Sequence, residues 1–502
     1  MRKKRLRRLG ILVVTVLAAM ASVCPAAADK TSREDWPCWR GPRTDGTAGE
    51  IPPASALVHK PEDARLVWKS EAEWTRPYGF TSGYASPCVA DGRVFLFWYV
   101  GDGKSILKTR REGHFINKKN GSLPDAFKDR LASIAADEIV LCVDARNGKT
   151  LWRWVMPSRG INLMCTNGKN GGHFSMAAAD GKAFAIGTNA RLYALDAATG
   201  ETLWSAPTGG TEQREQWLEA CIAANSAKVP ANGKNPLSGC PRQDRGLVCS
   251  CAAYADGVVL FRDKAFDADT GKVRWTCKRY GGYASPVVWN HEGRSYFISG
   301  GGLCVEPETG KVLWEAEGGF DRKDHRATVV VGDGYLVLGA ANACYRITPE
   351  KAELVWKIDK GGGCDMGSSS VIHNGHLWAN TSHPGGHRRE GKKYGGAANH
   401  VCIELATGKE VARIGAPSNS GSLVAFGPWI IQESIGAGPL HKDLAKGLGV
   451  YRADPKAPFA LVCAIRYPGP RQDSVTPAIV GSRIYIRGGE RLYCYDLAKA
   501  DG

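Results

Sequence analysis

The cysteine residues are the first side chains whose chemistry has to be explained. The 502-residue chain holds 16 of them, and 15 remain once Cys24 is removed with the signal segment described below. No two cysteines are adjacent, and no haem attachment motif of the form CxxCH is present. Cys249 and Cys251 alternate along a predicted strand, but two thiols without a matching second pair are a weak metal signal. We therefore predict no thiolate metal site.

One cysteine pair is a candidate for a disulfide. Cys221 and Cys240 both lie in a long insertion, near residues 209–248, that has no core of its own to hold it. Connectivity cannot be read from spacing alone, so a bridged pair and two free thiols both remain open.

Three histidines, His383, His387 and His400, fall in one Gly-rich segment. Imidazole groups gathered in this way could bind a transition metal. No Asp or Cys of suitable spacing joins them, so we expect a solvated loop instead of a metal site.

A repeated motif of the form AxDxxTGxxxW indicates the elements that must position these side chains. Each copy predicts a strand that ends at the acidic residue, a turn whose Gly accepts a positive φ, and a strand whose Trp packs between neighbouring sheets. Two further strands upstream complete a four-stranded unit. The sequence therefore predicts an all-β fold, an eight-bladed β-propeller. The copies begin at Cys142, Ala194, Ala265, Cys304, Cys344, Cys402, Val450 and Cys494.

The two ends of the chain complement each other. The last copy stops before its Trp strand, whereas residues 65–69 form a Trp strand without a hairpin, so the N-terminal strand is expected to close the ring. We predict a signal peptide over 1–28, an N-terminal extension over 29–64 and a single propeller over 65–502. Insertions are expected near 101–138, 209–248 and 383–400.

Five cysteines stand at the first motif position, where other copies carry Ala194 and Ala265. We expect each of them to be a small buried packing residue instead of a reactive thiol. They are Cys142, Cys304, Cys344, Cys402 and Cys494.

The motif resembles the tryptophan-docking motif of quinoprotein dehydrogenases, which use pyrroloquinoline quinone (PQQ), and of outer-membrane assembly propellers. The segment WPCWRGPRTDG, residues 36–46, also resembles the opening of an exported bacterial family with quinoprotein-like repeats. For an enzyme, the resemblance implies PQQ and calcium on the channel axis, held by a Glu, an Asn and an Asp over a Trp, commonly with a vicinal disulfide. Because this chain has no adjacent cysteines and several blades of near-minimal length, we predict no cofactor, with PQQ and calcium as the alternative.

Polar side chains precede the first strand of nearly every blade. In a propeller these positions surround one mouth of the channel, which is the default binding site of the architecture. Mixed charges there suit a small polar ligand or a peptide loop, although any channel mouth is wet and tends to be polar. No catalytic residue is assigned, because acid–base pairing depends on a distance. The candidates are Arg76, His173, Arg245, Tyr283, His325, Arg326, Asp365, Asn419, Gln472 and Asp473.

The N-terminus reads as a cleavable signal: basic residues over 2–8, an apolar run over 11–21, and Ala26, Ala27 and Ala28, after which we expect cleavage. The apolar run is short for a membrane span, so we expect export to the periplasm or cell envelope without a transmembrane span. Removing six positive charges lowers the net charge from +16 to +10. The remaining cations are scattered, which argues against a nucleic-acid partner.

These observations favour an exported, monomeric, non-catalytic binding or assembly scaffold that uses the channel mouth to bind a protein partner or a small polar ligand. The alternative is a quinone-dependent oxidoreductase, or another enzyme with its site at that mouth.

Overall fold

The computed structural model describes most of the strands and turns of the chain. A unit of residues 31–502 is separate from Met1–Lys30, and only the former is described below. Among the described residues, no helix is long and apolar enough to cross a membrane. The described ranges are 35–49, 52–53, 56–58, 64–71, 85–101, 135–157, 160–161, 175–187, 189–209, 250–278, 284–319, 328–339, 341–358, 369–382, 388–389, 392–393, 398–415, 422–434, 447–465, 476–488 and 491–499.

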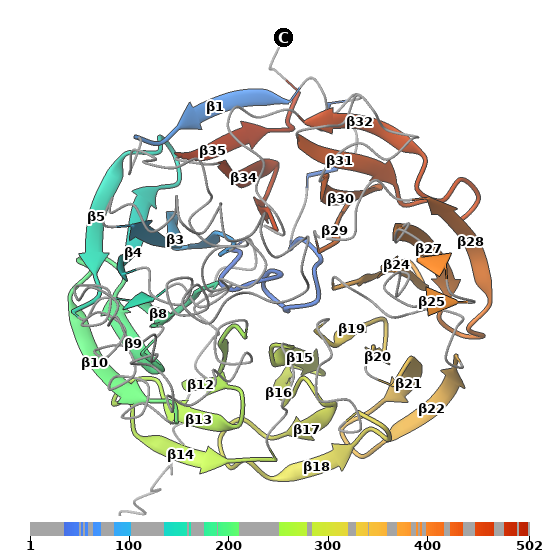
Figure 1. The fold of residues 1–502 in the computed structure, drawn as a ribbon, viewed down its shortest axis with the longest axis horizontal. Helices are drawn as coiled ribbons and strands as arrows, with labels where there is room; N and C mark the ends of the chain where they lie inside the picture. Colours follow the sequence, from blue (N-terminus) through green and yellow to red (C-terminus); the bar gives the residue numbers. More distant parts are fainter. Residues whose placement is uncertain are drawn as a thin grey trace, which may run out of the picture. The chain divides into compact units, whose positions relative to one another are not determined.

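Eight antiparallel sheets, the blades, are arranged as a ring around a channel (Figure 1). In each blade, four strands lie side by side, the innermost at the channel and the outermost at the rim. Blade 1 comprises β2 (Cys88–Ala90), β3 (Arg93–Gly101), β4 (Ala135–Asp144) and β5 (Thr150–Val155), and blade 2 comprises β7 (Ala177–Ala179), β8 (Lys182–Ile186), β9 (Arg191–Asp196) and β10 (Thr202–Pro207). Blade 3 comprises β11 (Ala253–Ala255), β12 (Val258–Phe261), β13 (Lys264–Asp267) and β14 (Val273–Thr276), and blade 4 comprises β15 (Val287–His291), β16 (Arg294–Ile298), β17 (Leu303–Val305) and β18 (Val312–Glu315). The short β6 (Gly160–Ile161) adds to β4.

The remaining strands complete the ring and confirm the predicted eight-bladed propeller. Blade 5 comprises β19 (Val330–Gly332), β20 (Tyr335–Leu338), β21 (Ala343–Ile347) and β22 (Ala352–Lys357), and blade 6 comprises β23 (Val371–His373), β24 (His376–Ser382), β27 (Ala398–Glu404) and β28 (Glu410–Gly415). Blade 7 comprises β29 (Val424–Phe426), β30 (Trp429–Ser434), β31 (Gly447–Arg452) and β32 (Leu461–Ile465), and blade 8 comprises β33 (Ala478–Val480), β34 (Arg483–Gly488), β35 (Arg491–Asp496) and β1 (Arg65–Lys69). A small ribbon pairs β25 (Arg388–Arg389) with β26 (Lys392–Lys393).

The N-terminal strand closes the ring as expected. β1 pairs antiparallel with β35, and Trp68 lies opposite Cys494 (Figure 1). The eighth blade is therefore made from both ends of the propeller. The domain boundaries at residues 28 and 64 stay predictions.

Six motif tryptophans dock one blade onto the next. All eight outermost strands carry a β-bulge near the start or the middle of the strand, which also blunts the exposed sheet edge. Next to the bulge, the indole Nε1 donates to a main-chain carbonyl in the motif turn of the neighbouring blade, and in five of the six cases that carbonyl directly follows the acidic motif residue. These bonds are Trp68 to Ala145, Trp152 to Ala197, Trp204 to Ala268, Trp275 to Pro307, Trp314 to Thr348 and Trp356 to Leu405, at 2.8–3.1 Å.

The first motif position is small because its residue lies directly across the sheet from that Trp. Cys142 is opposite Trp152, and Cys344 is opposite Trp356. All five motif cysteines are fully buried, which confirms them as packing residues. Burial raises the pKa of the Cys142 and Cys344 thiols to about 12, so neither is a reactive thiolate.

Two blades lack the Trp, and another aromatic residue packs between blades 6 and 7. Phe459, in a turn of blade 7, meets Trp378 of β24 at a centroid distance of 5.1 Å and stacks on His400 at 4.4 Å. His400 lies in β27 and is fully buried. The expectation of a solvated loop was therefore wrong for His400, because its ring packs in the core, whereas His383 and His387 lie outside the described residues.

One face of the ring, here named the turn face, carries the turn after the innermost strand of each blade and, in blades 1 to 7, the motif turn. Within a blade, the turn after the innermost strand is bonded to the motif turn, as when Ala197 N donates to Gly181 O at 2.9 Å. Equivalent bonds recur in six further blades, so the turn face is internally braced. The middle of each segment that connects successive blades lies outside the described residues.

Candidate functional site

The segment that carries the WPCWRGPRTDG sequence, Asp35–Ala48, lies inside the ring, and we call it the plug (Figure 1). It starts against blade 1, where Trp36 and Val89 exchange both main-chain hydrogen bonds, at 2.9 and 2.7 Å. Blade 2 follows, with Ala178 N donating to Pro37 O at 2.6 Å. The plug therefore pairs its main chain with the inner edges of blades 1 and 2.

The second half of the plug contacts the opposite side of the channel. Val288 N of β15 donates to Thr44 Oγ1 at 2.7 Å. Ala425 of β29 donates to Gly46 O at 2.8 Å and accepts from Ala48 N at 3.0 Å. Blades 4 and 7 are thus held by the same short segment.

Two side chains at the tip of the plug complete these contacts. Trp39 Nε1 donates to Thr476 Oγ1 of blade 8 at 3.3 Å, and Arg40 Nη2 donates to the Ser370 carbonyl of blade 6. The plug therefore bonds to six of the eight blades and ties distant parts of the ring together.

Arg40 explains much of the motif in which it lies. Its guanidinium is fully buried and donates to the carbonyls of Thr44 and Asp45, at 3.3 and 2.7 Å. Burial lowers the pKa of Arg40 to about 10, an effect that Asp45 partly opposes. Gly46 has a φ of +86°, and a Cβ there would lie 2.6 Å from Arg40 Nη2. The motif thus encodes the fold of the plug.

A belt of hydroxyl groups encircles the channel two residues before each innermost strand, and Cys251 replaces the hydroxyl in blade 3. The main-chain N–H of one belt residue donates to the hydroxyl of the next blade. The hydrogen bonds run from Thr476 to Ser86, Ser86 to Ser175, Cys251 to Ser285, Ser285 to Thr328, Thr328 to Ser369 and Ser369 to Ser422, at 2.8–3.3 Å. Sequence reasoning missed this belt, although a Ser, Thr or Cys at one aligned position in all eight blades was available as a signal.

The described part of the channel does not fit PQQ with calcium. Trp36 and Arg40 of the plug are fully buried there, and the Arg40 cation would repel a calcium ion beside it. Among the described residues, no three His, Cys, Asp or Glu side chains lie close enough together to hold a metal ion.

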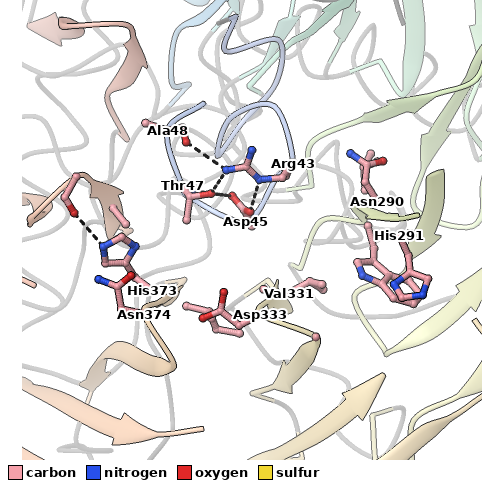
Figure 2. A pocket seen from close by; sticks show the side chains of 17 residues that line it. Arg43, Asp45, Thr47, Ala48, Asn290, His291, Val331, Asp333, His373 and Asn374 are labelled. Atoms are coloured by element: carbon pink, nitrogen blue, oxygen red, sulfur yellow. Dashed lines mark hydrogen bonds and ion pairs between the residues drawn. The ribbon is translucent and has the colours of Figure 1, made fainter. Parts of the chain in front are cut away.

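A cavity of about 430 Å³ opens at the turn face between the plug and blades 4 to 7 (Figure 2). Its volume falls within the range of roughly 300–1,000 Å³ typical of ligand sites. The apolar part of the wall comes from innermost strands and includes Val288, Val331, Ile372 and Ala425. Polar side chains form the rim, which comprises Arg43, Asp45, Thr47, Asn290, His291, Asp333, His373 and Asn374.

On the plug side of the cavity, the charges are paired internally. Arg43 Nε donates to Asp45 Oδ2 at 2.9 Å, and its Nη2 donates to Thr47 Oγ1 at 2.5 Å (Figure 2). Asp45 Oδ1 also accepts from Thr47 N at 2.7 Å and from Thr47 Oγ1 at 2.6 Å. Such a carboxylate is a structural group, held in place by its three donors.

On the blade side, Asp333 and His373 supply the polar groups. Asp333 Oδ2 accepts from Gly375 N at 2.9 Å, and His373 Nε2 lies 2.9 Å from the Gly427 carbonyl. Burial lowers the pKa of His373, so its ring is neutral near pH 7, with Nε2 donating and Nδ1 left as an acceptor. Asp333 is exposed and carries the charge that the rim leaves uncompensated.

All ten channel-mouth residues predicted from the sequence, from Arg76 to Asp473, lie outside the described residues, as do Cys221 and Cys240. Their grouping and the disulfide stay predictions. The cavity residues were not among the candidates, because they lie in the plug, in the innermost strands and in the turns that follow these strands, whereas the candidates precede the innermost strands.

An eight-bladed ring whose blades are joined by tryptophan docking defines the class of PQQ-like β-propellers. Within that class, the chain belongs to the PQQ_2 family, whose model, described as outer membrane protein assembly factor BamB, matches residues 136–411, more than half of the sequence. The resemblance inferred from the motifs is therefore confirmed.

Individual relatives agree with this assignment. The quinohemoprotein alcohol dehydrogenase ADH IIB of Pseudomonas putida is 27% identical over 255 residues, which cover 46% of this chain and 33% of that protein. The chain thus spans about a third of the length of that relative. The quinohemoprotein alcohol dehydrogenase structure of Comamonas testosteroni superposes with a TM-score of 0.53 at 13% identity, covering 94% of this chain and 82% of that one. The ADHIIG structure of Pseudomonas putida gives 0.53 at 12% identity, with 94% and 81% covered. At these identities the structures support the fold alone.

Proposed function

We propose that this protein is an exported, monomeric, non-catalytic scaffold that binds a protein partner, or a small polar ligand, at the mouths of its channel. The observation that carries the proposal is the plug. The main chain of the plug and the buried Arg40 guanidinium occupy the channel and make the ring rigid. The rims of the channel then remain as the surfaces for binding.

Membership of the PQQ_2 family supports the proposal, because the family model is described by an assembly factor and not by an enzyme. The quinohemoprotein relatives keep an oxidoreductase in view as the alternative. Against that alternative stands the poor fit of the described channel to calcium and PQQ. We place the protein in the periplasm or cell envelope on the basis of its N-terminal signal pattern.

A titration of the full chain with PQQ and calcium tests the proposal. The mature protein is expected to show no saturable change in PQQ absorbance or in heat of binding, while an apo quinohemoprotein alcohol dehydrogenase serves as the positive control. Stoichiometric uptake of PQQ would overturn the scaffold proposal in favour of the oxidoreductase.

A further inference from the structure

The turns beside the cavity follow a rule that fixes where an inner blade edge can accept a new strand. In a two-residue hairpin, the residues that flank the turn bond to each other, so the residue before them directs its N–H and C=O away from the blade. In blade 1 the turn is Asp91–Gly92, and this outward-directed residue is Val89. The rule therefore predicts one free pairing position at the inner edge of each such blade.

The plug uses these positions wherever it reaches them. It pairs with Val89 in blade 1, Ala178 in blade 2 and Ala425 in blade 7, each of them the residue before the one that flanks the turn. The inner edges of the ring are thus demonstrated pairing sites for an extended main chain.

Blades 5 and 6 carry the same position at the wall of the cavity. It is Val331 in β19, before the turn Asp333–Gly334, and Ile372 in β23, before the turn at Asn374. Both residues line the cavity, and within the described part of the chain neither has a main-chain partner outside its own blade. As far as the described residues show, two pairing sites of the kind that the plug occupies elsewhere therefore line the cavity without a main-chain occupant.

The charge on the rim selects the side chain that a ligand would bring. Arg43 is engaged by Asp45, so the two charges on the plug side cancel. Asp333 has only the Gly375 N–H as a described partner and remains a net negative charge at the rim. An ammonium or guanidinium group complements it.

We infer that the cavity binds an extended peptide segment of a partner protein, which pairs its main chain with Val331 and Ile372 and places a basic side chain against Asp333. This inference rests on the proposed scaffold function and names the kind of partner that it takes.

Calorimetric titration of the full mature chain with the capped tripeptide Ac-Ala-Lys-Ala-NH2 tests this inference. Saturable binding is expected. Asp333→Asn should weaken it about three- to fivefold, the size expected of a partly exposed ion pair. Asp91→Asn is the matched control: it makes the same change at the equivalent turn of blade 1, whose edge the plug already fills, and should leave the affinity unchanged.

Main-chain pairing is tested on the side of the probe, without any risk to folding. Methylation of the peptide nitrogens removes the donors that a strand edge needs and should weaken binding about tenfold or more. No binding, equal effects of Asp333→Asn and Asp91→Asn, or an unaffected N-methylated peptide would each overturn the inference. Such failures leave the scaffold proposal standing, because that proposal is decided by the titration with PQQ and calcium.

Discussion

Trp68 Nε1 donates a hydrogen bond of 3.0 Å to the carbonyl of Ala145, and with it the last blade is docked onto the first. The same bond joins blades that are consecutive along the chain, as between Trp152 and Ala197. At the closure, β1 is continuous along the chain with blade 1, whereas it is held to the rest of blade 8 by its non-covalent antiparallel pairing with β35. The stability of the ring should therefore depend on how firmly β1 docks between β35 and blade 1.

Replacing the closing tryptophan is expected to separate packing from hydrogen bonding. Trp68→Ala should lower the free energy of unfolding by about 3–5 kcal/mol, the usual cost of removing a buried Trp. Trp68→Phe should cost much less, because the ring still packs and the Ala145 carbonyl keeps Arg483 and Tyr485 as donors. Chemical denaturation followed by circular dichroism measures both. Equal losses in the two variants would contradict a closure based on packing.

The motif glycine is expected to be needed for two reasons: it adopts a positive φ, and its lack of a side chain leaves room for the docked Trp ring. Gly200 has a φ of +77°, and a Cβ there would lie 2.7 Å from the Trp152 ring. Gly181 has a φ of +69°, but a Cβ there would meet nothing within 4 Å. Gly181→Ala should therefore cost only the conformational strain, about 1–2 kcal/mol. Gly200→Ala should cost at least about 1 kcal/mol more, from overpacking, and urea unfolding midpoints of the two variants give the comparison.

The eight-bladed ring could be predicted because the features that specify each blade lie within its own sequence repeat. Turn glycines, small residues opposite Trp and strands of fixed spacing are local features, so the copies from Cys142 to Cys494 were enough to count the blades. Closure followed from a missing strand at one end and a spare strand at the other. Both inferences needed no knowledge of contacts between distant residues.

The plug and the cavity could not be predicted in this way. The sequence over 36–46 stands out as a motif, but nothing local says that Trp36 pairs with Val89 or that Arg40 reaches Ser370, which lies 330 residues away. The cavity lies where the described plug makes no main-chain pairing with blades 5 and 6. In sequence, the turns beside the cavity resemble the equivalent turns of the other blades. The cavity therefore cannot be located until the long-range contacts of the plug are known.

Individual hydrogen bonds between the plug and the blades should each contribute to the free energy of unfolding. Thr44→Val keeps the shape of the side chain but removes the Oγ1 that accepts from Val288 N, leaving a buried donor without a partner. The free energy of unfolding should fall by about 1–3 kcal/mol. Thr44→Ser retains the hydroxyl and is the control. Hydrogen exchange of the Val288 amide should quicken in the Val variant alone, and unchanged protection would show that the plug does not hold blade 4.

The motif cysteines should behave as spacers beneath the tryptophans. Cys344→Ala is expected to cost no more than about 1–1.5 kcal/mol, since Ala stands at this position in blades 2 and 3. Cys344→Leu should cost about 1–3 kcal/mol by overpacking against Trp356. The reciprocal change, Ala265→Cys, should be tolerated. Thermal unfolding of the three variants tests the set, and a severe loss in Cys344→Ala would point to a role for the thiol itself.

Acid should weaken the motif turns through their aspartates. Hydrogen bonds from Arg274 and Thr270 lower the pKa of Asp267 to about 2, with Arg274 Nη2 lying 2.7 Å from Asp267 Oδ2. Because this folded pKa lies below the unfolded value of about 3.9, the stabilisation is complete above pH 4. It is lost as the pH falls from about 4 toward 2.

The difference in unfolding midpoint between the wild-type chain and Asp267→Asn should therefore shrink over that pH window. Arg274→Gln removes the charge that favours the ionised carboxylate and should flatten the same part of the curve. Urea unfolding at pH 5, 4, 3 and 2 provides the measurement. A wild-type advantage that persists unchanged at pH 2 would mean that the turn is held by its main chain and not by the Asp267 carboxylate.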